Sequence, residues 1–160
     1  QEAINNYIQK NCDVFTDLIT ELSFMRTKTS EPSEHKILNE IISREPLGPV
    51  VRHGDNEWID IVRWSLYTLI LAEELNINSQ NVDDKINSLN PEILRLLGVV
   101  GNYGDMVELD YNWAYNIIKN LGNYKTIFDR TIGPNTAIGL ERGINNLWNN
   151  GGILYAPPFK

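Results

Sequence analysis

Residues with a strand-like pattern occupy only two short stretches of this chain, both near its beginning. Residues 12–16 contain the β-favouring Val14 and Phe15, and residues 35–42 alternate imperfectly around three isoleucines. Two strands alone are marginal in water, because a sheet needs further strands or a packed helix to bury an apolar face. The pattern therefore predicts an α/β protein whose remaining strands are encoded outside these residues.

The rest of the chain is predicted to be largely helical. A short helix is expected over residues 2–10, and a second over residues 17–28 with Asp17 placed to cap it. Further helices are expected from near Ser79, from Pro91, and over residues 111–121, 124–131 and 138–149. The tail at residues 155–158 (YAPP) is extended and apolar, so we expect it to pack against another part of the protein.

A connector stiffened by two prolines lies between the second predicted strand and a long predicted helix. Pro46 and Pro49 force an extended backbone, because each disfavours helical geometry in the residue before it. A long helix then begins at about Asp55, a good N-cap, and runs to Leu75. Charged residues interrupt its apolar face, so the helix is expected to be buried in protein and not to span a membrane.

Charge and composition exclude several classes of partner. The chain has 160 residues and a formal net charge of −7, and no basic stripe is present to displace counterions from phosphates. We therefore expect no nucleic-acid partner, and the absence of a basic amphipathic helix predicts no direct membrane insertion. The chain opens at Gln1 without an initiator Met or a signal sequence, which suggests that it starts inside a longer precursor.

No constellation of catalytic or metal-binding residues is evident. His35 and His53 lie far apart, and neither has a Ser or Cys nucleophile in a recognisable motif. His35 is expected to be solvated in its polar stretch, and a turn into a helix explains the surroundings of His53. Cys12 is the single cysteine, so it is either a small buried residue or the partner of a cysteine outside this chain. We expect no enzyme activity, no cofactor and no metal.

Three segments together resemble one family of proteins. The first is residues 40–55 (EIISREPLGPVVRHGD), followed by Trp58 and Trp64. The other two are residues 113–128, with WAY, LGNY and IF, and residues 133–158, with GPNT, GLERG, NLW, GG and YAPP. These long motifs are similar to those of the periplasmic general L-amino-acid-binding proteins, the substrate-binding components of polar amino-acid ABC transporters.

The resemblance implies a two-lobed α/β fold, the type II periplasmic-binding-protein fold, of which this chain is the C-terminal half and mostly helical. Residues 1–36 would end the second lobe, residues 37–54 would cross between lobes, and residues 55–160 would form the helical C-terminal part of the first lobe. The implied function is the capture of free L-amino acids in the periplasm for the permease subunits of an ABC importer. Cys12 matches a cysteine of the family that could bridge to an absent strand.

The resemblance also suggests ligand-binding residues, at Asp17 and Thr16. In the family, an acidic residue just after the strand that contains the cysteine accepts hydrogen bonds from the α-ammonium group of the ligand, which needs a charged acceptor once it leaves water. Counted without gaps, that position falls on Leu18, one residue after Asp17. Either Asp17 takes the role through a local shift, or it is a plain helix cap and ligand binding has changed or been lost. The family's carboxylate-binding arginine would lie before Gln1.

Two other interpretations remain open at this point. In the first, these residues form an isolated helical structural or interaction fragment that binds no ligand, which Leu18 at the acid position would favour. In the second, the protein is an enzyme that uses the same two-lobed fold, but this would require an acid and base pair that the sequence does not provide.

Overall fold

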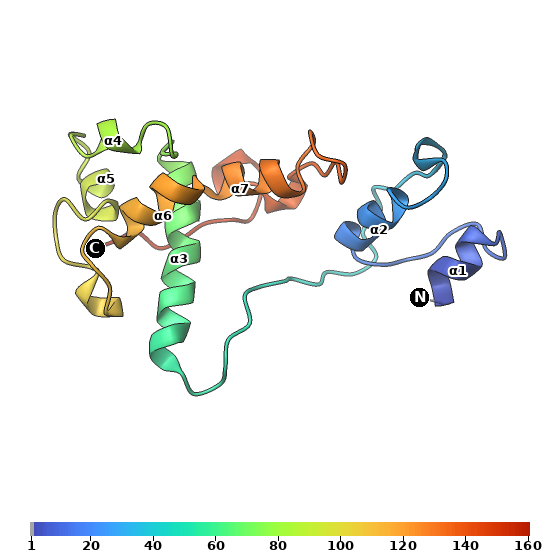
Figure 1. The fold of residues 1–160 in the computed structure, drawn as a ribbon, viewed down its shortest axis with the longest axis horizontal. Coiled ribbons are helices and arrows are strands. Elements are labelled where there is room, and N and C mark those ends of the chain that lie inside the picture. Colours follow the sequence, from blue (N-terminus) through green and yellow to red (C-terminus); the bar gives the residue numbers. More distant parts are fainter. Residues whose placement is uncertain (1) are drawn as a thin grey trace. The chain divides into compact units, whose positions relative to one another are not determined.

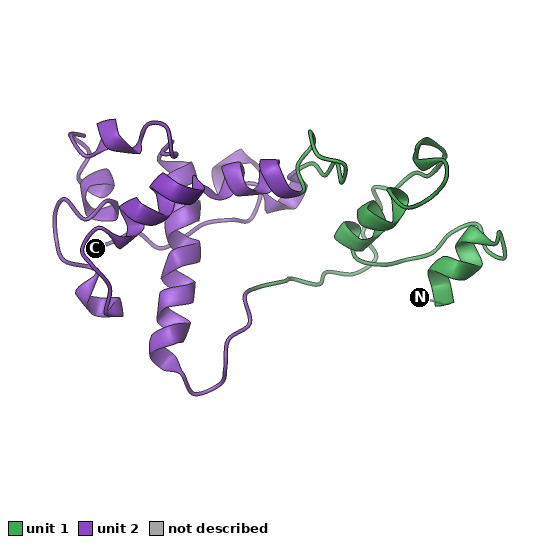
Figure 2. Ribbon diagram, viewed as in Figure 1, with its two compact units in different colours: residues 1–48, 132–141 green, residues 49–131, 142–160 purple. Residues whose placement is uncertain are grey.

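A computed structural model describes residues 2–160, which divide into two compact units (Figures 1 and 2). Unit 1 comprises the chain up to residue 48 together with residues 132–141, and unit 2 comprises residues 49–131 and 142–160. Within the described residues every regular element is helical, and the β pairing is limited to an isolated bridge between Leu147 and Leu154. None of these helices is long and apolar enough to cross a membrane.

Unit 1 has little core of its own. It contains α1 (Glu2–Ile8), α2 (Ile19–Arg26) and the 3-10 turn η1 (Pro32–Glu34). Tyr7 of α1 packs on Phe15, with 5.0 Å between the ring centroids, and its hydroxyl is hydrogen-bonded to Nδ1 of His35 at 2.6 Å. His35 is therefore half-buried, and the prediction of a solvated histidine was wrong.

Neither predicted strand is formed. Residues 12–16 and 35–42 have irregular or extended backbone without ladder hydrogen bonds. A strand is defined by its pairing, and the described residues offer these two segments no neighbouring strand. The connector is extended as predicted, since residues 40–52 contain no helix or turn.

Helix α2 also begins later than predicted. Its N-cap residue is Leu18, with φ −58° and ψ 142°, and no side chain caps the helix. Asp17 lies one residue too early, and its Oδ1 accepts a hydrogen bond from the backbone N–H of Leu18 at 2.8 Å. The prediction that Asp17 is the helix cap was therefore wrong.

Unit 2 is built around α3 (Asn56–Glu74), a helix of 19 residues. The predicted cap at Asp55 is confirmed, because its Oδ1 accepts the backbone N–H of Trp58 at 3.1 Å. Around it lie α4 (Val82–Lys85), α5 (Pro91–Leu96), the 3-10 turn η2 (Asp105–Val107), α6 (Trp113–Leu121) and α7 (Tyr124–Thr131). Helices α6 and α7 pack against α3, and α7 has the predicted bounds.

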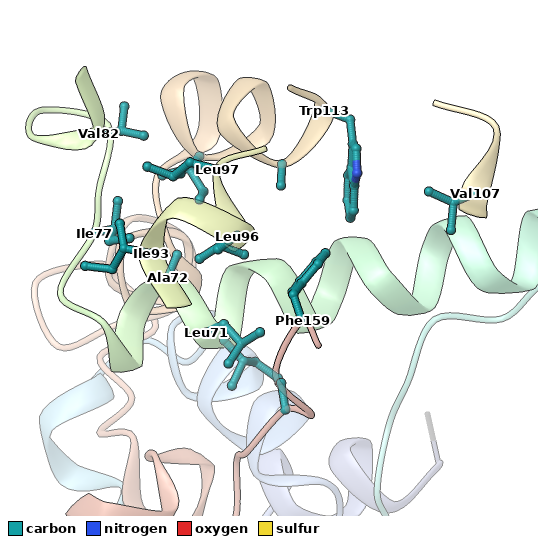
Figure 3. Close-up of a cluster of buried hydrophobic side chains, with 14 of the residues drawn as sticks. Leu71, Ala72, Ile77, Val82, Ile93, Leu96, Leu97, Val107, Trp113 and Phe159 are labelled. Atoms are coloured by element: carbon teal, nitrogen blue, oxygen red, sulfur yellow. The ribbon is translucent and has the colours of Figure 1, made fainter. Parts of the chain in front are cut away.

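The core of unit 2 is closed by the C-terminal tail (Figure 3). Phe159 is 5% exposed and lies 5.1 Å from the ring of Trp64, 5.5 Å from Tyr103 and 6.1 Å from Trp113. The carbonyl oxygen of Phe159 accepts a hydrogen bond from Nε of Arg95 at 2.8 Å. The prediction that the tail at residues 155–158 packs against another part of the protein is confirmed only for Ala156, which is 8% exposed, whereas Tyr155 is 69% exposed and the residue that enters the core is Phe159.

Residues 138–149 do not form the predicted helix. Gly139 and Gly143 have φ values of +67° and +48°, which lie outside the right-handed helical region. The segment instead contains irregular backbone and the 3-10 turns η3 (Gly143–Asn145) and η4 (Trp148–Asn150).

A buried ion pair connects Arg142 to Glu73 of α3 within unit 2. The side chains of Arg142 and Glu73 are 9% and 8% exposed. Arg142 Nη2 donates to Glu73 Oε2 at 3.2 Å, and Nη1 lies 3.2 Å from Oε1 without the angle of a hydrogen bond. The guanidinium also lies 5.1 Å from the ring centroid of Tyr124 and 5.3 Å from that of Phe128, both on α7. One side chain thus links three segments of the unit.

Candidate ligand-binding site

The two predicted ligand-binding residues, Thr16 and Asp17, lie side by side in the loop before α2 and are both exposed. The Oδ1 atom of Asp17 is occupied by the N–H of Leu18, but the second carboxylate oxygen has no hydrogen bond or ion pair within residues 2–160. The hydroxyl of Thr16 likewise has no hydrogen-bond partner in the part of the chain described here. Both side chains therefore keep the capacity to contact a ligand.

Leu18 stands at the position where the resemblance would place an acid. Its side chain is half-buried and aliphatic, so it cannot accept a hydrogen bond from an ammonium group. Asp17, the residue before Leu18, does not cap α2 and has one carboxylate oxygen without a partner among residues 2–160.

The loop of residues 132–141 completes unit 1 at the other end of α2. Nη2 of Arg26, in the last turn of α2, donates to the carbonyl oxygen of Ile138 at 3.4 Å. The loop is closed by a backbone hydrogen bond from the N–H of Leu140 to the oxygen of Ile132, at 2.9 Å. The C-terminal end of α2 is thus bonded to this loop, while no side chain of the described residues caps the end that follows Asp17.

Two other residues singled out in the sequence, His53 and Cys12, lie outside the helices. His53 is exposed and lines an open depression of about 580 Å³ formed by residues 52–57, the predicted turn into α3. Cys12 is half-buried and free. Among residues 2–160, no group of three His, Cys, Asp or Glu side chains is arranged to hold a metal ion.

A cluster of side chains that joins α4 and α6, away from the predicted site, has altered pKa values. Asp83 Oδ2 lies 2.5 Å from Nζ of Lys119, and its Oδ1 accepts the hydroxyl of Tyr115 at 2.7 Å. The hydrogen bond from Lys119, followed by that from Tyr115, lowers the pKa of Asp83. The bonds to Asp83 raise the pKa values of Tyr115 and Lys119. These interactions connect α4 and α6 on the exposed surface of unit 2.

A groove in unit 2 was missed by the sequence reasoning. Its volume is about 490 Å³, and it lies between the end of α3, the start of α5 and the C-terminal tail. Trp148 lines it, and the indole Nε1 donates to Glu74 Oε1 at 3.0 Å. Trp148 falls within the helix predicted over residues 138–149, so no sequence signal places it beside α3.

The chain is similar in sequence to three proteins named for amino-acid binding. It is 53% identical over 150 residues to YhdW of Escherichia coli (strain K12), which is assigned as an amino-acid ABC transporter-binding protein. It is 49% identical over 156 residues to the general L-amino acid-binding periplasmic protein AapJ of Rhizobium johnstonii. It is also 49% identical over 150 residues to the glutamate/glutamine/aspartate/asparagine-binding protein BztA of Rhodobacter capsulatus. The chain is homologous to the amino-acid-binding proteins of ABC transporters.

These matches cover nearly all of the chain but only part of each relative. They include 93% to 96% of this chain and 44% to 46% of the relatives, so the chain spans about half their length. The match fits the C-terminal part of the family, as the resemblance implied. No family model matches the chain. The relatives are all named as binding proteins.

A solved structure agrees with the sequence matches. An ABC transporter periplasmic binding protein from Brucella ovis, with glutathione bound, is 42% identical and superposes with a TM-score of 0.91. The match covers 99% of this chain and 50% of that protein. The fold of the chain is therefore that of half a periplasmic binding protein, here with helical elements and no strand among residues 2–160.

Proposed function

We propose that the complete protein captures free L-amino acids in the periplasm and delivers them to the permease subunits of an ABC importer. The observation that carries this proposal is sequence identity of about one half, over nearly the whole chain, to three proteins named for amino-acid binding. The isolated-fragment alternative is less favoured, because the similarity runs through all three motif segments and does not stop at a single helix pair.

The exposed apolar side chains support a larger, two-lobed protein. Ile41, Ile42 and Leu47 of the extended connector are 70%, 81% and 77% exposed, and Val50 is 95% exposed. A row of such side chains on unpaired, extended backbone is expected to be covered, because both the apolar surface and the free peptide groups favour pairing. We propose that the connector pairs in a sheet of the type II fold, with residues 1–36 in the second lobe and residues 55–160 in the first.

We further propose that Asp17 binds the α-ammonium group of the ligand and that Thr16 contributes a hydroxyl contact. The free oxygen of Asp17 supplies the negative acceptor that a desolvated ammonium requires. Glutathione carries a free α-ammonium group too, so the ligand of the Brucella ovis protein is a reasonable second candidate for this site.

Calorimetric titration of the complete gene product with a panel of L-amino acids and glutathione tests the proposal. We expect binding to at least one amino acid. Asp17→Asn should weaken it by roughly 10- to 100-fold, the loss of one hydrogen bond to a charged group. Thr16→Val should have a smaller effect, and Asp13→Asn, which changes another exposed aspartate of the same loop, should leave the affinity unchanged.

The possible results separate the two parts of the proposal. If the wild-type protein binds no amino acid, the proposed function is wrong. If it binds and Asp17→Asn binds equally well, the function stands and the assignment of Asp17 must be abandoned.

A further inference from the structure

The groove beside α3 combines an apolar lining with two aromatic side chains that remain in water. Leu71, Ala156 and Pro158 line it, and the first two are buried. Trp148 and Tyr155 line it too, yet they are 57% and 69% exposed. Aromatic side chains that are exposed beside a concave apolar surface are typical of binding sites, because they supply a large contact area with little loss of conformational entropy.

The groove also carries negative charge that the protein does not neutralise. Glu74 uses one oxygen to accept the indole N–H of Trp148, which fixes both side chains. Its other oxygen and the carboxylate of Glu92 form no hydrogen bond or ion pair within residues 2–160. Arg95, one turn after Glu92 on α5, instead directs Nε to the carbonyl oxygen of Phe159. The groove therefore holds two carboxylates without a cation, in a chain of net charge −7.

A guanidinium group complements this arrangement. It is flat, so it stacks on an indole or phenol ring, and its N–H groups bond carboxylates in the same plane. Its three methylene groups can cover the apolar lining. We propose that the groove receives the side chain of an arginine presented by a protein partner. The identification of that partner as the importer's permease rests on the proposed function.

Binding of a blocked arginine to the complete gene product tests the groove directly. The probe is N-acetyl-L-arginine N-methylamide, which lacks the free ammonium and carboxylate that an amino-acid site recognises. With ¹⁵N-labelled tryptophan, we expect the indole resonance of Trp148 to shift saturably in the millimolar range. The indole resonances of Trp58, Trp64 and Trp113 should not move. The corresponding citrulline derivative, neutral but of the same shape, should cause little shift.

Glutamine substitutions provide the matched comparison. Glu92→Gln should weaken binding of the probe by about two- to fivefold, because an exposed charge pair contributes up to about 1 kcal/mol. Glu108→Gln, which changes an exposed glutamate elsewhere in unit 2, should leave it unchanged. An equal shift with the citrulline derivative, an unaffected Glu92→Gln variant, or no shift of Trp148 at all would overturn the proposal.

Reversal of the charge at Glu92 tests whether the groove binds a protein partner during import. In cells that depend on this protein for uptake, Glu92→Arg should reduce import of the bound amino acid by about fivefold or more, because like charges now oppose docking. Calorimetry should show an unchanged affinity for the amino acid. Unchanged import would overturn the assignment of a protein partner. Failure of the wild-type protein to bind any amino acid would instead refute the proposed function, and the arginine titration would still stand as measured.

Discussion

Replacement of Arg142 by methionine should strongly destabilise unit 2. The substitution keeps most of the apolar volume but leaves the carboxylate of Glu73, only 8% exposed, without its partner. Removing one member of a buried ion pair costs about 3–5 kcal/mol. The contacts of the guanidinium with the rings of Tyr124 and Phe128 are lost as well, and each contributes about 0.5–1 kcal/mol. The ratio of folded to unfolded protein should therefore fall by at least roughly 100-fold.

Urea unfolding of the complete gene product, followed by tryptophan fluorescence, measures this loss as a lower midpoint with an unchanged slope. The decisive comparison is the double variant Glu73→Met with Arg142→Met, which removes both charges. We expect it to recover most of the lost free energy, because a buried ion pair and an apolar pair of similar volume are often equally stable. If the double variant is as unstable as Arg142→Met, the cost lies in packing, and the reasoning from an unpaired buried charge is refuted.

Three further substitutions follow from the described contacts. Phe159→Ala should lower the free energy of unfolding by about 3–5 kcal/mol, because a buried ring is replaced by a cavity, and calorimetry would show a lower Tm. Asp55→Ala removes the cap of α3 and should cost about 0.5–2 kcal/mol in urea unfolding. Asp83→Asn should make Tm less sensitive to acid. The partners of Asp83 hold its pKa below the usual 3.8, so its stabilising contribution is complete above about pH 5 and is lost as the pH falls through the lowered pKa.

Matched controls are available on the same elements. Lys160→Ala changes the exposed residue beside Phe159 and should leave Tm unaltered. Asn56→Ala lies next to the cap but has no capping role, and it should cost less than Asp55→Ala. A Tm that falls equally between pH 7 and pH 3 in wild type and Asp83→Asn would contradict the linkage to Asp83.

Most helices of unit 2 could be predicted because their local signals agree with their packing, whereas α4 begins at Val82 and not near Ser79 as predicted. The Asp55 cap, Pro91 in the first turn of α5 and Gly122 after α6 all mark helix ends in the sequence and in the structure. The homology could also be predicted from the three motif segments. Long and specific motifs can be recognised in the sequence without knowledge of the tertiary structure.

The errors occur where local pattern and tertiary context diverge. Residues 12–16 and 35–42 have strand-like composition, but pairing depends on partners that these residues do not supply. The spacing of apolar residues after Ile138 is typical of a helix. No helix forms there, because Gly139 and Gly143 have positive φ values. The groove at Trp148 could not be found by spacing, because its two carboxylates come from Glu74 and Glu92, on separate helices. The role of Asp17 is still a prediction.

The division of the chain into units has a consequence for how the protein can be dissected. The backbone passes from one unit to the other near residues 48, 131 and 141, so unit 1 is not a continuous stretch of sequence. A truncation at the connector would separate α2 from the ten-residue loop to which Arg26 is hydrogen-bonded. That loop would remain in the C-terminal fragment, with the residues of unit 2. Excision of unit 2 requires a short engineered bridge between residues 131 and 142, and excision of unit 1 requires a linker that joins residue 48 to residues 132–141.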